Sequence, residues 1–199
     1  MADLRAVGVQ VGSPADAIPA PSPADAIPAI GSDEPRLLPA RWWHVAQLVE
    51  LEGELFPTDP WTVEMFVAEL AADGRSLQVA LDDRGRVRGY VDVAVSGRDA
   101  ELMTIAVAAA KAGRGWGGTL LEWAVRHAEA AGADRMFLEV RSGNRAEALY
   151  RRAGFEPIDL RRGYYADGGD AVVMVKALGS GSGSGSGSGR PEDGRVLDA

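Results

Sequence analysis

The chain has 199 residues, of which 46% are hydrophobic and 25% are charged, as is typical of a soluble globular domain. Cysteine is absent, which excludes disulfides, thiolate zinc sites and a thiol nucleophile. The formal net charge of −8 argues against a general nucleic-acid binder, because that function needs a basic surface.

Membrane and metal partners are not expected either. No apolar run is long enough to span a bilayer, and the start lacks the basic and apolar stretches of a secretory signal. The only histidines are His44 and His127, and without cysteine they do not suggest a metal site. We therefore expect a cytoplasmic protein that binds no metal, no membrane and no nucleic acid.

Both ends of the chain differ from the middle in composition. Residues 1–35 are rich in Pro, Ala and Asp and repeat the octapeptide SPADAIPA, and residues 179–189 alternate Gly and Ser. Such segments have too few large apolar side chains to offset the entropy of ordering the chain. We expect residues 1–35 and 179–199 to be disordered, the latter as a linker and tail, with one folded domain over 36–178.

The hydrophobic periodicity of the middle predicts alternating strands and helices. Thr62 is a predicted N-cap, and Gly132 is the predicted end of the longest helix. In chain order we expect a strand at 36–40, helices at 42–55 and 63–72, strands at 76–82, 86–95 and 99–107, a helix ending near Ala131, a strand at 135–141, a helix at 145–152, and strands at 155–161 and 171–177. This order predicts an α/β protein with a mixed sheet, in which the apolar strand at 99–107 is central.

A glycine-rich turn, Gly113-Arg-Gly-Trp-Gly-Gly118, lies between the strand at 99–107 and the next helix. A helix N-terminus offers unpaired N–H groups and a partial positive charge, and glycine lets an anion approach the backbone closely. The pattern therefore indicates a pyrophosphate site. It is neither a Walker loop nor a dinucleotide fingerprint, because their spacings are not met. A tight turn without a ligand is the alternative.

The segments around this turn resemble the GNAT N-acetyltransferases, and among them the RimI-type enzymes. The matching segments are Glu54-Leu-Phe-Pro57 with Pro60-Trp61, Thr104-Ile-Ala-Val107, the glycine turn with Leu120-Leu121, Leu138-Glu-Val-Arg141, Asn144, Ala148-Leu-Tyr150 with Gly154-Phe155, and Leu160-Arg-Arg-Gly-Tyr-Tyr165 with Asp170-Ala-Val-Val-Met174. The resemblance implies the GNAT fold over 36–178: a mixed, mostly antiparallel central sheet flanked by helices, whose splayed central strands bind acetyl-CoA.

The resemblance also implies a reaction, in which an amine attacks the thioester carbonyl of acetyl-CoA. Glu139 would accept the amine's proton, and Tyr150 would protonate the departing thiolate. The plainer alternatives are that Glu139 only pairs with a neighbour such as Arg141, and that Tyr150 is a core residue with one wet end. RimI-type enzymes act on the N-terminal alanine of small-subunit ribosomal protein eighteen, so the implied partner is a peptide or protein N-terminus.

Further site residues are carried over from the same motifs. For acetyl-CoA they are Ile105 and Val107 on a bulged strand, Gly113, Arg114, Gly115, Trp116, Gly117 and Gly118 in the turn, and Asn144; for the peptide they are Leu55, Trp61, Tyr164 and Tyr165. The aromatic residues could instead belong to the core, and Arg161 and Arg162 could be solvated. Two departures affect these roles: Ala112 stands where the family has Gln or Arg, and Asn144 lies six rather than seven residues before Tyr150.

Three functions are compatible with these residues. The first is acetylation of a protein α-amine, as in the RimI type. The second keeps the chemistry but changes the acceptor to a lysine side chain or a small amine. The third is a non-catalytic acyl-CoA-binding module, against which the retained Glu139 and Tyr150 argue.

Overall fold

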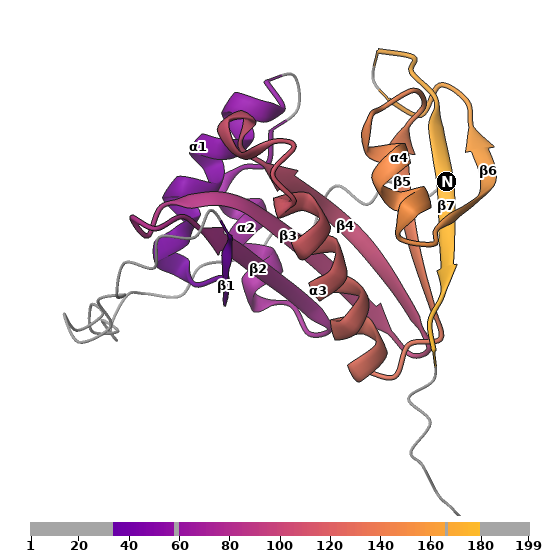
Figure 1. Cartoon of the computed structure of the whole chain (residues 1–199), viewed down its shortest axis with the longest axis horizontal. Helices are drawn as coiled ribbons and strands as arrows, with labels where there is room; N and C mark the ends of the chain where they lie inside the picture. The colour runs from indigo at the N-terminus through magenta and orange to yellow at the C-terminus, as the bar shows by residue number, and fades with distance from the viewer. Residues whose placement is uncertain (1–33, 58–59, 166, 180–199) are drawn as a thin grey trace, which may run out of the picture. The chain divides into compact units, whose positions relative to one another are not determined.

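A computed structural model describes residues 34–57, 60–165 and 167–179 of the chain (Figure 1). The predictions of disorder for 1–35 and 179–199 fall almost wholly outside these residues. Within them, no helix is long and apolar enough to cross a bilayer.

The strands form one seven-stranded sheet in the order β1-β2-β3-β4-β5-β7-β6. The strands are β1 (Arg36–Pro39), β2 (Arg75–Leu81), β3 (Val87–Ser96), β4 (Asp99–Val107), β5 (Arg135–Arg141), β6 (Glu156–Arg161) and β7 (Ala171–Ala177). Only β4 and β5 pair in parallel, and all other neighbours are antiparallel. The predicted mixed sheet is confirmed, with β4 at its centre.

The helices also lie close to their predicted positions. They are α1 (Val45–Leu55), α2 (Val63–Ala71), α3 (Trp116–Ala130) and α4 (Ala146–Arg152), with 3-10 turns η2 (Trp42–His44) and η3 (Ala109–Lys111). The predicted helix at 42–55 thus begins as a 3-10 turn. Thr62 caps α2 as predicted, since its side chain accepts a hydrogen bond from the backbone of Met65 at 3.4 Å. Gly132 follows the C-cap Ala131 in the left-handed conformation, with φ of 88°.

Side chains that alternate along β3 show which helices cover each face of the sheet. Val91 and Val93 belong to the apolar cluster that includes the inner side of α3. Tyr90 points the other way, and its ring lies 5.7 Å from that of Phe66 on α2. One face of β3 is therefore covered by α3 and the other by α1 and α2 (Figure 1).

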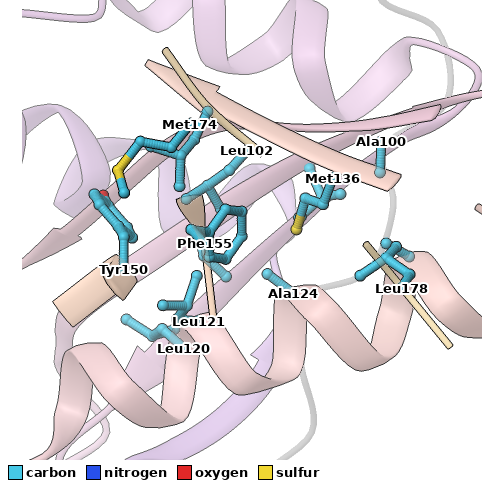
Figure 2. Close-up of a cluster of buried hydrophobic side chains, with 14 of the residues drawn as sticks. Ala100, Leu102, Leu120, Leu121, Ala124, Met136, Tyr150, Phe155, Met174 and Leu178 are labelled. Atoms are coloured by element: carbon cyan, nitrogen blue, oxygen red, sulfur yellow. The ribbon is translucent and has the colours of Figure 1, made fainter. Parts of the chain in front are cut away.

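The larger apolar core joins α3 to the C-terminal strands and α4. Figure 2 shows Leu121 of α3 directed towards Phe155, with Tyr150, Met174 and Met136 around that ring. Phe155 and Met136 are at most 2% exposed, and burying side chains of this size contributes about 1.5–3 kcal/mol each. This core holds together the two parts of the sheet on either side of the β4–β5 junction.

That junction is short. Pairing between β4 and β5 runs from Asp99 and Arg135 only to Leu102 and Leu138, after which the strands diverge (Figure 1). On the other side of β4 the register with β3 shifts by one residue, so that Met103 is a bulge. The splayed, bulged strand implied by the resemblance is confirmed, although no feature of the sequence itself marks the bulge.

A buried carboxylate lies beside this bulge. Asp92 of β3, paired with Thr104, is completely buried beside the carboxylate of Glu69. Burial, followed by the nearby Glu69 carboxylate, raises the pKa of Asp92 to about 7. Arg75 opposes this shift while pairing with Glu69 at 3.3 Å.

Replacing Asp92 by Asn is expected to stabilise the fold at pH 8 and to do so much less at pH 5. The folded state keeps the Asp92 proton up to about pH 7, whereas the unfolded chain releases it near pH 4, so stability from this group falls progressively between about pH 4 and pH 7 and is fully lost at pH 8. At pH 8 the gain should be roughly 1–3 kcal/mol by urea unfolding. Asp83→Asn in the exposed β2–β3 turn is the control, and an equal effect of Asp92→Asn at both pH values would contradict this account.

Candidate active site

The divergence of β4 and β5 opens a cavity of about 840 Å³. Its walls come from the end of α1, from both splayed strands, and from α4 and the segment before it. The lining residues are Leu55, Phe56, Pro57, Leu102, Met103, Thr104, Ile105, Ala106, Val107, Ala112, Leu138, Glu139, Val140, Arg141, Asn144, Ala146, Tyr150 and Tyr165. The structure thus brings the predicted Glu139 and Tyr150 to one cavity, together with Ile105, Val107 and Asn144.

Glu139 lies on β5 directly after the last residue that pairs with β4. Its carboxylate forms an ion pair with Arg161 of β6 and accepts a hydrogen bond from the hydroxyl of Tyr164. This bond is the main reason why the pKa of Tyr164 is raised to about 12. The side chain of Glu139 is 19% exposed, so its carboxylate is both held in place and reachable from the cavity.

Arg141, the neighbour expected as an alternative partner of Glu139, is engaged elsewhere. Its guanidinium binds Asp167 at 3.0 Å and lies 4.0 Å from the centre of the Tyr165 ring. Glu139 is therefore paired as the plainer alternative expected, but with Arg161 and not with Arg141, and Arg161 is not merely solvated. On one face of β5, Glu139 and Arg141 each have an oppositely charged partner, Arg161 and Asp167. Each also contacts a tyrosine from the segment between β6 and β7, Tyr164 and Tyr165 respectively.

Tyr150 reaches the cavity from α4 and is almost fully buried. Its position is fixed by the end of the helix: Gly154 has φ of 88°, and the N–H of Phe155 donates to the carbonyl of Tyr150 at 3.0 Å. The ring of Phe155 then packs edge-on against that of Tyr150. Burial, with a smaller effect of Tyr165, raises the pKa of Tyr150 to about 12, so the hydroxyl is a neutral proton donor at physiological pH.

The glycine-rich turn follows Ala112, which lies on the cavity wall. Gly113 and Gly115 have φ of 74° and 87°, so glycine is required there for the backbone conformation. Gly115 is the N-cap of α3, whose first turn carries no acidic side chain. Trp116 is 1% exposed, so only its backbone could meet an anion. An added Cβ at Gly118 would meet nothing within 4 Å.

The shortened loop before α4 keeps Asn144 on the cavity wall. Its side-chain oxygen accepts a hydrogen bond from the N–H of Ala146 at 2.9 Å, which forms a tight turn directly before α4, whose N-cap is Arg145. The N–H of Gly143 donates to the carboxylate of Glu147 at 2.7 Å. With the shorter spacing, Asn144 and Tyr150 both still line the cavity.

The residues predicted to bind a peptide are only partly brought together. Leu55 and Tyr165 line the cavity, and Tyr164 contacts Glu139 beside it. Trp61 is not among the lining residues. Its ring packs on Phe66, and its backbone N–H donates to the carboxylate of Glu52 at 2.8 Å. Phe56 and Pro57 line the cavity; they belong to the Glu54–Pro57 segment of the resemblance, but only Leu55 of that segment was named as a site residue.

Among the described residues, no group of histidine, aspartate and glutamate side chains is placed to hold a metal ion. The site offers a carboxylate, a phenol hydroxyl, two unpaired strand edges and, after Ala112, a helix N-terminus without acidic side chains in its first turn. These groups suit proton transfer at an elongated ligand that carries a phosphate group.

Comparison with known proteins gives consistent matches. The profile of the acetyltransferase (GNAT) family matches residues 42–155. The chain is 33% identical over 132 residues to a putative ribosomal protein bS18-alanine N-acetyltransferase of Bacillus subtilis, covering 65% of this chain and 87% of that protein. It is 39% identical over 132 residues to the N-alpha-acetyltransferase RimI of Mycobacterium tuberculosis, covering 63% and 81%. The crystal structure of the ribosomal-protein-S18-alanine N-acetyltransferase of Escherichia coli superposes with a TM-score of 0.66 at 26% identity, covering 72% of this chain and 94% of that one.

Proposed function

Because the chain belongs to the acetyltransferase (GNAT) family, we propose that it transfers the acetyl group of acetyl-CoA to the N-terminal α-amine of a protein in the cytoplasm. The observation that carries this proposal is the presence of Glu139 and Tyr150 in one cavity at the β4–β5 divergence. The relatives named as ribosomal protein bS18-alanine N-acetyltransferases make such a protein the first acceptor to test.

In this proposal the diverging strands hold the thioester. The edge of β4 that includes Ile105 and Val107 faces the cavity, so its backbone groups can pair with the amides of the pantetheine arm as with an added strand. The N–H groups at the start of α3, from Gly115 to Gly118, then meet the pyrophosphate. Arg114 supplies a cation in the same turn, although Ala112 lacks the polar side chain that the family has there.

Glu139 and Tyr150 take the two proton transfers. An α-amine is partly protonated at neutral pH and must lose a proton to attack, and Glu139 accepts that proton directly or through a water. The nitrogen forms a bond to the carbonyl carbon as the carbon–sulfur bond breaks. Tyr150, whose phenol is protonated at neutral pH, donates its proton to the departing sulfur. The products are an acetylated N-terminus and CoA.

The proposal is tested by mass spectrometry of two peptides incubated with the protein and acetyl-CoA. One has a free N-terminal Ala and no Lys, and the other is blocked at its N-terminus and contains an internal Lys. Addition of one acetyl group to the first peptide alone is the expected result. Acetylation of the second alone would replace the proposal by a lysine acetyltransferase, and modification of neither would leave small amines or a binding module.

Introducing a carboxylate at the start of α3 should weaken CoA binding while it stabilises the fold. Gly118→Asp places a negative charge at an open position in the first turn, which favours the helix by about 0.5–1 kcal/mol but repels a pyrophosphate. Calorimetry should show an affinity for CoA lowered about tenfold, with a raised melting temperature. Gly118→Asn, similar in shape but uncharged, is the control. Unchanged affinity in Gly118→Asp would remove this helix terminus from the binding site.

A further inference from the structure

Arg161 reaches Glu139 across an intervening strand. Glu139 and Asp159 both flank Val173 of β7, and Arg161 lies two residues beyond Asp159 on the same face of β6. Its side chain is 52% exposed and ends on the carboxylate of Glu139, and its guanidinium lies 5.7 Å from the ring of Tyr164. The cationic side chain of Arg161 thus contacts the proposed base, Glu139, although half of that side chain is exposed to solvent.

The contact occurs where a second hollow meets the cavity. This hollow, of about 330 Å³, shares Leu138 and Glu139 with the cavity and has Arg161 on its rim. It lies on the side of the proposed base away from the glycine turn. Any acceptor amine that reaches Glu139 comes next to this guanidinium, because the two groups are in direct contact.

The charges around this point nearly balance. The titratable and charged side chains on the elements around Glu139 are Asp99 and Glu101 on β4, Arg135 and Arg141 on β5, Glu147, Tyr150, Arg151 and Arg152 on α4, Glu156, Asp159 and Arg161 on β6, Arg162, Tyr164, Tyr165, Asp167 and Asp170 in the segment before β7, and Lys176 on β7. Asp99 pairs with Arg135 at 2.8 Å, and Arg141 pairs with Asp167. Glu139 would attract any ammonium group, and Arg161 is the cation in direct contact with it that cancels this attraction.

We propose that Arg161 is a positioning and specificity-determining residue, which keeps ammonium groups away from Glu139 and so selects acceptor amines that are readily neutral. This inference rests on the proposed function and names its acceptor class. An α-amine ordinarily has a pKa of about 7.7–8.0, whereas a lysine amine has one of about 10.4. At neutral pH a site that disfavours positive charge therefore binds the α-amine, part of which is neutral, and rejects the lysine amine, which is almost wholly protonated.

Removing the cation changes turnover in a defined direction. Without Arg161 the site around the acceptor has one positive charge less, so the pKa of the bound acceptor amine is higher. In Arg161→Met the pH at which kcat is half-maximal should therefore rise, by about one unit. Below that pH kcat and the acceptor KM should fall together, since the ammonium form binds well but cannot attack.

The experiment compares Arg161→Met with Arg161→Lys and with Arg162→Met, the matching change at the exposed neighbour. The readouts are the pH profile of kcat for the free-Ala peptide and inhibition by the blocked Lys peptide. Arg161→Met should raise the half-maximal pH and lower the inhibition constant of the Lys peptide about tenfold. Arg161→Lys keeps the charge and should restore both values to within about threefold, and Arg162→Met should leave them unchanged.

A wild-type pH profile and inhibition constant in Arg161→Met would overturn the inference while the proposed function stands. If the wild-type protein acetylates no peptide, the proposed function fails separately. Calorimetric binding of the blocked Lys peptide to the CoA-loaded protein at pH 6 then decides the inference. About tenfold tighter binding to Arg161→Met would support charge exclusion, and equal binding would reject it.

Discussion

Replacing Tyr150 by Phe should lower kcat by about 100-fold or more while leaving the affinity for acetyl-CoA nearly unchanged. The substitution removes one oxygen from a ring that α4 and Phe155 hold in place, so the cavity keeps its shape. Only protonation of the departing thiolate is lost. The measurements are kcat for the free-Ala peptide and the dissociation constant of acetyl-CoA by calorimetry.

Tyr90 provides the matched control. It is also completely buried, but it packs against Phe66 on the other face of β3, and its hydroxyl has no hydrogen-bond partner among the described residues. Tyr90→Phe should therefore keep full activity and the same or slightly higher stability. If Tyr150→Phe retains wild-type kcat, Tyr150 has no part in the chemistry and is a core residue.

Glu139→Gln is expected to reduce kcat by about 100- to 1,000-fold at pH 7. The amide has the shape of the carboxylate but cannot accept the proton of the acceptor amine. Stability should change little, because the Arg161 left without its partner is half exposed. Part of the lost rate should return at high pH, where the α-amine is already neutral, and a pH series of single-turnover rates measures this recovery.

Glu101→Gln tests whether the loss of any carboxylate near the site lowers kcat as much as the loss of Glu139. Glu101 is an exposed residue of β4 in the hollow beside Glu139. Its substitution should change kcat less than threefold, because it lies outside the cavity in which the thioester is expected to bind. A loss equal to that of Glu139→Gln would mean that general negative charge, and not a positioned base, supports the reaction.

The strands, the helices and the glycine turn could be predicted from the sequence because their determinants are local. Alternating and helical apolar periods set the elements, and Gly113 and Gly115 supply a backbone conformation that other residues adopt at a cost. The joint presence of Glu139 and Tyr150 at one cavity was expected from the resemblance alone. Their roles in catalysis stay predictions.

The environment of Glu139 could not be predicted in the same way. Arg161 becomes its partner only because β7 lies between β5 and β6, which brings residues 22 positions apart to one face of the sheet. The nearby Arg141 was the obvious partner by sequence distance, yet it is held by Asp167 and Tyr165. Trp61 was assigned to the peptide groove by motif, whereas contact with Phe66 keeps it in the packing of α2.

The short junction between β4 and β5 has a consequence for how the protein unfolds. Only four residue pairs connect the two parts of the sheet, so the apolar core centred on Phe155 and Met136 supplies most of their coupling. Backbone amides on both sides of the junction should then exchange with deuterium at one common rate, that of global opening. Truncating Phe155 would let the C-terminal part exchange earlier and separate one cooperative unit into two.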